Sequence, residues 1–206
     1  MKSILITAAI ASVLGSGASF ADQGDWLIRG RLLSVAPNES ASINPIGGDV
    51  DIDTSFVPEL DISYFFTERF AVELILGVTP HDVMAIGTAA GNVDLGEVTL
   101  LPPTLTVQYH FRPEGTIHPY VGAGINYTVF FNENLAAGSI ATAIDYDNSF
   151  GLALQGGIDF DVNENWFFNV DVKYIDINTD VTINNAITAD VDIDPWVFGI
   201  GIGRRF

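Results

Sequence analysis

The sequence predicts an all-β fold, an eight-stranded antiparallel β-barrel that spans a membrane. Three observations support this fold class. About eight runs place large apolar side chains at every second residue, with polar residues or glycine between them. Short and long connections alternate strictly between these runs. The final run, 194–206, ends on the aromatic residue Phe206, as bacterial outer-membrane barrels usually do.

Residues 1–21 have the pattern of a secretory signal peptide. A short apolar run, 4–14, follows a basic residue, and the small residues Ser19 and Ala21 stand where a signal peptidase requires them. This apolar run is shorter than the ~20 residues that a membrane-spanning helix needs. We therefore expect cleavage after Ala21 and a mature chain, 22–206, that forms a single barrel domain.

In each run the apolar residues share one parity, and hence one face of the strand. In the first four runs these outward positions are Trp26, Ile28 and Leu32 (run 26–32); Phe56, Pro58, Leu60, Ile62, Tyr64 and Phe66 (run 56–66); Phe70, Val72, Leu74, Leu76 and Val78 (run 70–78); and Leu101, Pro103, Leu105, Val107, Tyr109 and Phe111 (run 101–111). Polar residues such as Arg29 and Glu73 occupy the alternate, inward positions.

The second half of the chain repeats this pattern. The outward positions are Val121, Ala123, Ile125, Tyr127 and Val129 (run 121–129); Phe150, Leu152, Leu154, Ile158 and Phe160 (run 150–160); Phe168, Val170, Val172 and Tyr174 (run 166–174); and Trp196, Phe198, Ile200 and Ile202 (run 194–206). The last run carries mainly glycine and arginine on its other face. A bulky apolar face opposite such a face suits the wall of a membrane barrel.

The connections favour a membrane barrel over a soluble barrel such as a lipocalin. The short ones are 67–69, 112–117 and 161–165, and the long ones are 37–53, 80–96, 132–147 and 178–192. This alternation predicts short periplasmic turns, long extracellular loops and both termini in the periplasm. Aromatic residues near the strand ends predict two interfacial girdles. One contains Phe66, Phe70, Tyr109, Phe111, Phe160 and Trp166, and the other Tyr127, Phe130, Phe131, Phe150 and Trp196.

The charge of the chain excludes one class of partner. Its 26 acidic and 8 basic residues give a formal net charge of −18, which argues against binding to nucleic acid. The chain has no cysteine, so no disulfide holds it together. The acidic runs 49–53, 145–147 and 190–194 fall where the strand pattern lapses or begins.

Several charged residues have inward parity. They are Arg29, Arg31 and Lys173, together with Glu59, Asp61, Glu73, Asp159 and Asp171. A barrel of about eight strands is just filled by side chains or holds one small ligand, which is too narrow for a porin channel. We therefore expect these residues to form ion pairs that plug the lumen. The alternative is that part of this network lines a gated passage.

Four segments resemble the OmpW family of small outer-membrane barrels. They are Leu100–Phe111 (LLPPTLTVQYHF), His118–Phe131 (HPYVGAGINYTVFF), Asn165–Ile177 (NWFFNVDVKYIDI) and Asp194–Phe206 (DPWVFGIGIGRRF). The resemblance implies an eight-stranded barrel in the outer membrane of a Gram-negative bacterium. It further implies an apolar interior that admits small hydrophobic molecules and releases them sideways through the wall. Outer-membrane lipid, lipopolysaccharide and, through Phe206, the barrel-assembly machinery are the implied partners.

Three prolines in the strands fit a lateral exit. Pro58, Pro102 and Pro103 lack an amide hydrogen and delete ladder hydrogen bonds from the extracellular part of the wall. The alternative is that they only end a strand near the rim or mark a bulge. We expect Ile75, Ile175, Leu95 and Leu135 to line the apolar interior. Lys173 stands where some relatives carry an aromatic residue, so we expect it to close the lower end of this interior by a salt bridge to Asp171, Glu73 or Asp61.

Two other classes of function remain open. The acidic runs suggest a surface-interaction barrel whose loops bind divalent cations, lipopolysaccharide or a partner. They lack the glycine and the closing glutamate of an EF-hand, however, and alternation in a strand sends their carboxylates to one side only. A solvated acidic rim is the simpler interpretation. Catalysis is not expected, because His81 and Asp82 at the outer rim have no evident serine partner. No metal or redox cofactor is expected either.

Overall fold

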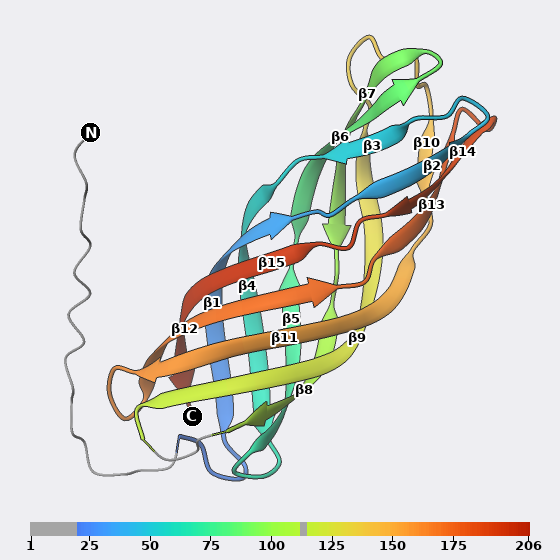
Figure 1. The fold of residues 1–206 in the computed structure, drawn as a ribbon. Coiled ribbons are helices and arrows are strands. Elements are labelled where there is room, and N and C mark those ends of the chain that lie inside the picture. Colours follow the sequence, from blue (N-terminus) through green and yellow to red (C-terminus); the bar gives the residue numbers. More distant parts are fainter. Residues whose placement is uncertain (1–19, 112–114) are drawn as a thin grey trace, which may run out of the picture.

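The computed structural model describes residues 20–111 and 115–206, so most of the expected signal peptide lies outside the described residues. None of the described residues belongs to a helix long and apolar enough to cross a membrane. Within these two ranges, eight strands pair in a closed antiparallel ring (Figure 1). In order around the ring they are β1 (Trp26–Ala36), β4 (Ser55–Phe65), β5 (Phe70–Gly77), β8 (Thr104–His110), β9 (Ile117–Asn134), β11 (Ser149–Asp161), β12 (Trp166–Ile175) and β15 (Trp196–Arg205). Each predicted run supplies one of these strands, which confirms the predicted barrel.

The wall is inverted relative to a soluble barrel. Apolar side chains cover its outside, where Phe198 is 52% and Leu152 63% exposed, while charged side chains such as Arg29 and Glu73 are fully buried inside. The alternation of apolar and polar residues produces this arrangement, because successive side chains of a strand point to opposite faces. Such a surface is stable when the outside faces lipid.

Glycines in β15 make room for two arginines. A Cβ atom at Gly201 would lie 2.8 Å from the Cγ atom of Arg31, and one at Gly203 would lie 3.0 Å from the Cγ atom of Arg29. Both distances are shorter than ordinary van der Waals contacts. The glycine parity of the last strand therefore reflects the space that the arginines of β1, its neighbour in the ring, occupy inside the barrel.

The four long connections are not irregular loops. Most of their residues form a β-structured extension at one end of the barrel (Figure 1). Its strands, in the described part of the chain, are β2 (Ser40–Asn44), β3 (Asp49–Ile52), β6 (Thr79–Thr88), β7 (Gly91–Leu101), β10 (Ile144–Tyr146), β13 (Asn178–Ile183) and β14 (Ile187–Asp192). One sheet continues the wall in the order β9-β7-β6-β3, and a second has the order β10-β13-β14-β2. We call these strands, with the upper part of β9, the extension.

The two sheets of the extension share one hydrophobic core. Val83 and Val98 from the first sheet and Val181 and Val191 from the second belong to the same buried cluster. Phe130 also belongs to it and points inward, so its assignment to an outer aromatic girdle was wrong. The long connections of this chain therefore enclose an apolar interior above the barrel.

Both ends of the described barrel domain lie at the short-connection end. The backbone nitrogen of Trp26 donates to the carbonyl oxygen of Phe206 at 3.1 Å, and that of Phe206 donates to the carbonyl oxygen of Trp26 at 2.9 Å. This pairing joins the start of β1 to the last residue of the chain, as the sequence predicts for two termini on one side of the membrane.

Candidate functional site

The lower half of the barrel interior, toward the short connections, is filled by buried polar side chains. Every charged member is at most 7% exposed. The set comprises three cations, Arg29, Arg31 and Lys173, and five carboxylates, Glu59, Asp61, Glu73, Asp159 and Asp171. These are the eight residues to which the sequence analysis gives inward parity, and the structure brings all of them together. We call this set the polar plug.

The two arginines reach across the lumen to several walls. From β1, Arg29 Nη2 lies 2.8 Å from Oδ2 of Asp159 on β11, and its Nη1 lies 3.1 Å from Oε1 of Glu73 on β5. Arg31 Nη1 lies 2.7 Å from Oδ2 of Asp61, and its Nη2 donates to the Tyr120 hydroxyl at 3.0 Å. Buried charges are tolerated when they are paired in this way. The polar plug therefore obstructs straight passage through the barrel.

Neutral polar side chains complete the polar plug around Glu73. Gln108 and Gln155 each donate a side-chain N–H to Oε2 of Glu73, at 2.7 and 2.8 Å. Ser63 donates to its Oε1 at 3.3 Å. Glu73 thus sits within the polar plug. It does not line either apolar cavity as a gate, because its carboxylate is surrounded by these three side chains and by Arg29 and Arg31.

Lys173 caps the polar plug on the side of the extension. Its Nζ lies 2.7 Å from Oε1 of Glu59 and 2.8 Å from Oδ1 of Asp171. The expected pair with Asp171 is present. Glu59 takes the place that the sequence analysis offered to Glu73 or Asp61, because those two carboxylates face Arg29 and Arg31. A single ammonium group therefore joins two carboxylates on opposite sides of β1 and β15.

An apolar cavity, the lower cavity, begins directly above this cap. Its wall includes Ile75 and Ile175, as predicted by parity, and Glu59 of the polar plug. The remaining wall residues are Leu33, Val35, Pro37, Gly77, Thr79, His81, Leu100, Pro102, Thr104, Ile177, Ile193, Pro195 and Val197. The lining thus changes from charged to almost wholly aliphatic within one layer of side chains.

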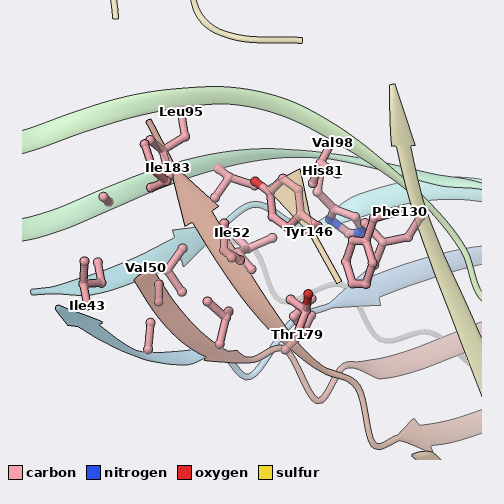
Figure 2. A pocket seen from close by; sticks show the side chains of 18 residues that line it. Ile43, Val50, Ile52, His81, Leu95, Val98, Phe130, Tyr146, Thr179 and Ile183 are labelled. Atoms are coloured by element: carbon pink, nitrogen blue, oxygen red, sulfur yellow. The ribbon is translucent and has the colours of Figure 1, made fainter. Parts of the chain in front are cut away.

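A second apolar cavity, the upper cavity, lies inside the extension (Figure 2). Its wall includes the predicted residue Leu95, the ring pair Phe130 and Tyr146, and His81, which also borders the lower cavity. Leu135 packs against the surrounding core but lines neither cavity, so this prediction is corrected. The residue lies in the segment after β9, outside the face that the strands turn inward.

Both cavities are nearly closed. The centre of a water-sized sphere can reach about 40 Å³ in the lower cavity and about 30 Å³ in the upper one. By the same measure one water needs about 10–15 Å³, so each cavity has room for only a few waters. A larger molecule can pass only when the lining side chains move.

The barrel wall has a gap in its backbone ladder beside the lower cavity. The pairing of β5 with β8 ends at Thr104, and the pairing of β6 with β7 begins at Leu100. Within the described residues, residues 101–103 lie between these two pairings and have no partner in β5 or β6. Pro102 and Pro103 account for much of this gap, because neither has an amide hydrogen to donate.

Lumen side chains satisfy the carbonyl groups at this gap. The Pro102 carbonyl accepts from the Thr104 hydroxyl at 3.0 Å and from the Asn126 amide at 3.1 Å. The Pro103 carbonyl accepts from the backbone nitrogen of Tyr127 at 3.2 Å, on the β9 side. The gap therefore does not leave these two carbonyls unsatisfied.

Pro58 lies at the end of another register. The pairing of β4 with β5 ends at Glu59 and Gly77, and Pro58 is the next residue of β4. Among the described registers, Val78 consequently has no partner on either side. The wall between β4 and β8 is thus least supported at the level of the lower cavity.

The short-connection end is closed by a separate aromatic cluster. Phe20 is 1% exposed and belongs to a buried cluster with Phe65 and Phe167. Its ring also stacks on His118 at a centroid distance of 4.1 Å. Phe20 falls within the expected signal peptide, so cleavage after Ala21 would remove its ring from this cluster.

The outer face of the extension is acidic. Asp49 and Asp51 of β3, and Asp190 and Asp192 of β14, are exposed, while the intervening Val50 and Val191 are buried. The carboxylates therefore lie on one side of each strand, as alternation predicts. Within the residues that the structure describes, no group of three or more His, Asp or Glu side chains is arranged to hold a metal ion.

Comparison with known proteins identifies the family. The model of the OmpW family matches residues 22–206. The chain belongs to the OmpW family. The match covers the whole barrel and extension, and it begins at the residue where the mature chain is expected to start. As an OmpW-family barrel, the protein is integral to the outer membrane of a Gram-negative bacterium, with the extension on the extracellular side.

Relatives match over most of their length. The chain is 46% identical to the uncharacterized outer-membrane protein y4mB of Sinorhizobium fredii, over 88% of this chain and 80% of that protein. It is 37% identical to outer membrane protein W of Vibrio cholerae over the full length of both. It is 30% identical to the dibenzothiophene metabolism operon protein PahQ of Pseudomonas aeruginosa, over 91% and 92% of the two chains.

A solved structure has the same OmpW-type architecture. The crystal structure of the outer membrane protein OprG from P. aeruginosa superposes with a TM-score of 0.82. It is 33% identical, and the match covers 90% of this chain and 97% of OprG.

Several residues of this OmpW-family interior were not predicted from the sequence. They include His81, Leu100, Phe130 and Ile193, which line one or both cavities. A signal for some of them was present: the acidic runs alternate with Val50, Ile52, Val191 and Ile193, and two-residue periodicity assigns these residues to the opposite, inward face.

Proposed function

We propose that this protein lets small hydrophobic molecules cross the outer membrane passively, by way of its apolar cavities and a sideways exit through the barrel wall. The main support is the arrangement of the interior. Two apolar cavities lie above the polar plug, and the lower one is beside a gap in the wall. Pro102 and Thr104 belong both to the lining of the lower cavity and to the border of the gap. A molecule in the lower cavity is therefore next to the least supported part of the wall.

The polar plug favours a sideways route over passage straight through the barrel. An apolar molecule moving toward the periplasm would have to separate paired charges, such as Lys173 and Glu59, without replacing their hydrogen bonds. Breaking a buried ion pair in this way is costly. Movement into the lipid, by contrast, keeps an apolar molecule in apolar surroundings throughout.

Several of the predicted site residues belong to this proposed route. Leu95 lines the upper cavity, and Ile75 and Ile175 line the lower one. Glu59 borders the lower cavity, and its ion pair with Lys173 is the proposed floor. The remaining members of the polar plug hold this floor in place, and Leu135 supports the core around the upper cavity.

A relative supports the substrate class. PahQ is named for the metabolism of dibenzothiophene, an apolar aromatic compound without charged groups. Its 30% identity extends over 91% of this chain. We take small apolar and aromatic compounds as the substrates of this chain, and outer-membrane lipid as the phase into which they leave.

The proposal is tested by comparing entry and conductance. Entry of a fluorescent apolar reporter is measured in cells that lack other copies of this barrel, with and without the protein, alongside single-channel recordings of the purified chain. Faster entry with little ion conductance is the expected result. If a folded barrel does not change the entry of the reporter, the proposal is wrong.

A surface-interaction role is the alternative, and the acidic outer face of the extension is the observation that favours it. Exposed carboxylates in rows, such as those of β3 and β14, could bind divalent cations that bridge to lipopolysaccharide. Their carboxylates are solvated and point away from the core, so we rank this role second. For membrane insertion, we propose that the barrel-assembly machinery recognises the end of β15, where the Phe206 side chain is 58% exposed.

A further inference from the structure

His81 on β6 is the one charged or imidazole side chain among the described residues that lines both apolar cavities. Its side chain is only 3% exposed. Leu100 and Ile193 are the other residues that border both cavities, so His81 stands at their junction. Figure 2 shows its ring on the wall of the upper cavity, together with the stacked rings of Phe130 and Tyr146.

The hydrogen bonding of His81 fixes its tautomer. Its Nδ1 lies 2.8 Å from the backbone carbonyl oxygen of Asp53. A carbonyl oxygen only accepts hydrogen bonds, so Nδ1 carries the hydrogen and donates. In the neutral ring Nε2 is then an acceptor with a free lone pair. No described residue donates to it.

The surroundings leave this acceptor to a ligand. The described buried atoms that lack both a partner and accessible surface do not include Nε2, so this nitrogen keeps some accessible surface on a residue that borders both cavities. Of the other polar side chains in the upper cavity, Thr179 donates its hydroxyl to the Asp147 carbonyl at 2.7 Å. Tyr146 adds a phenol hydroxyl, and the rest of the wall is mainly aliphatic. Few polar groups in an apolar cavity are typical of sites that select ligands by one directed hydrogen bond.

We propose that His81 determines specificity by accepting a hydrogen bond from a hydroxyl group of the passing molecule. The preferred ligands are then small, largely apolar molecules with one hydroxyl group, such as phenols and alicyclic alcohols, over the same skeletons without a donor. This proposal rests on the proposed uptake function and narrows its substrate class. A donor-free molecule would leave Nε2 desolvated and unpaired as it passes.

A matched pair of fluorescent compounds tests this preference. 2-Naphthol can donate to Nε2, whereas 2-methoxynaphthalene has the same ring system and no donor. Protein-dependent entry of each compound is the difference between cells with and without the barrel, and the amount of folded barrel is quantified by its heat-modifiable migration in gels. A hydrogen bond of ordinary strength corresponds to a preference of about fivefold for 2-naphthol.

Two variants separate the imidazole from the cavity size. His81→Leu is expected to abolish the preference, so that protein-dependent entry of both compounds becomes equal. Val83→Ala, two residues further along the same face, enlarges the cavity without removing a polar group. It is expected to change entry of both compounds by the same factor and to retain the preference. Equal entry through the wild-type barrel would overturn the proposal, as would a preference that persists in His81→Leu.

A spectroscopic measurement does not depend on the folding of a variant. The chain has three histidines, so the ¹⁵N resonances of His81 can be resolved in the refolded full-length barrel. Adding 2-naphthol should shift the Nε2 resonance of His81, and 2-methoxynaphthalene should not. A shift with neither compound overturns the specificity role. The two proposals fail differently: if neither compound enters faster with the barrel, the uptake function fails, whereas equal acceleration of both leaves uptake intact and removes only the role of His81.

Discussion

The Lys173 ammonium lies 2.7 Å from the Glu59 carboxylate at the level where the polar plug ends and the lower cavity begins. The same ammonium lies 2.8 Å from Asp171. This ammonium therefore pairs with Glu59, which lines the lower cavity and also lies 3.1 Å from Nη1 of Arg31. Its removal tests whether this pairing is the floor of the cavity.

Replacing Lys173 by methionine should destabilise the barrel by about 3–5 kcal/mol, because Glu59 and Asp171 would remain buried without this cation. Urea unfolding of the refolded chain in detergent micelles measures the loss. Arg69→Met is the control: Arg69 is exposed in a short turn, where losing a cation costs about 1 kcal/mol or less. Adding Glu59→Gln to Lys173→Met should recover part of the stability. If the Lys173→Met barrel were as stable as the wild type, the proposed role of the Lys173–Glu59 pair as the floor of the cavity would be wrong.

Gly203→Ala should hinder folding because its Cβ would meet the Phe167 ring and Cγ of Arg29. Overpacking of this kind typically costs about 1–3 kcal/mol. The control is Gly30→Ala on the neighbouring strand, since a Cβ there has nothing within 4 Å. The urea midpoints of the two variants should differ clearly. Equal midpoints would show that the Phe167 ring and Arg29 move aside without strain.

Pro102→Val together with Pro103→Val should slow entry of an apolar reporter while the barrel stays folded. Each valine supplies an amide hydrogen, so the ladders on the two sides of the gap can extend into it. Each new hydrogen bond of about 1 kcal/mol would reduce opening about fivefold. Pro119→Val, the same change near the periplasmic end of β9, should leave entry unaffected. Unchanged entry in the folded double variant would exclude the lateral route.

Calcium should not change the melting temperature of the folded barrel. The exposed carboxylates of β3 and β14 point outward in rows, and extracellular calcium modules bind with dissociation constants of about 10⁻⁴–10⁻³ M. Melting is compared by circular dichroism with about 10 mM calcium or with a chelator. A rise in melting temperature that Asp51→Asn with Asp192→Asn abolishes would favour the surface-interaction role.

Tyr146 should make the extension less stable in strong alkali. Burial raises the pKa of the Tyr146 hydroxyl above its ordinary value near 10, and the neighbouring Glu133 adds to this shift. The folded extension therefore favours the neutral phenol. Its contribution is complete below about pH 10 and is lost as the pH rises through the raised value. Hydrogen exchange of β10 and β13 should accelerate above pH 10 in the wild type, and less steeply in Tyr146→Phe.

Much of the barrel could be predicted from local alternation alone. Outward residues such as Leu152 and Phe198, and inward ones such as Arg29 and Lys173, follow from parity, because a strand has a side-chain period of two. Pairing partners across the lumen could not be predicted in the same way. Lys173 meets Glu59 from β4 because of the stagger of the strands, and a single sequence carries no direct record of that stagger.

The extension was the least predictable part of the chain. Its strands are short, and turns such as the one at Asn184 and Asn185, both with positive φ, interrupt the period. The upper cavity lies between two sheets whose strands are far apart in the sequence and pack together only in the folded protein. His81 was visible as a residue at the rim, but its position between two cavities depends on the packing of β13 and β14 against β6.

In the strands of the extension, residues that face solvent alternate with residues that face the core, so substitutions at the two sets of positions have different effects. Outward residues such as Asp51 and Asp190 contact solvent, while their neighbours Val50 and Val191 hold the interior together. Substitutions at the outward positions change the surface that the extension presents to solvent, and they leave the lining of the cavity untouched. The outer surface of the extension can therefore change one residue at a time while the upper cavity beneath it is kept.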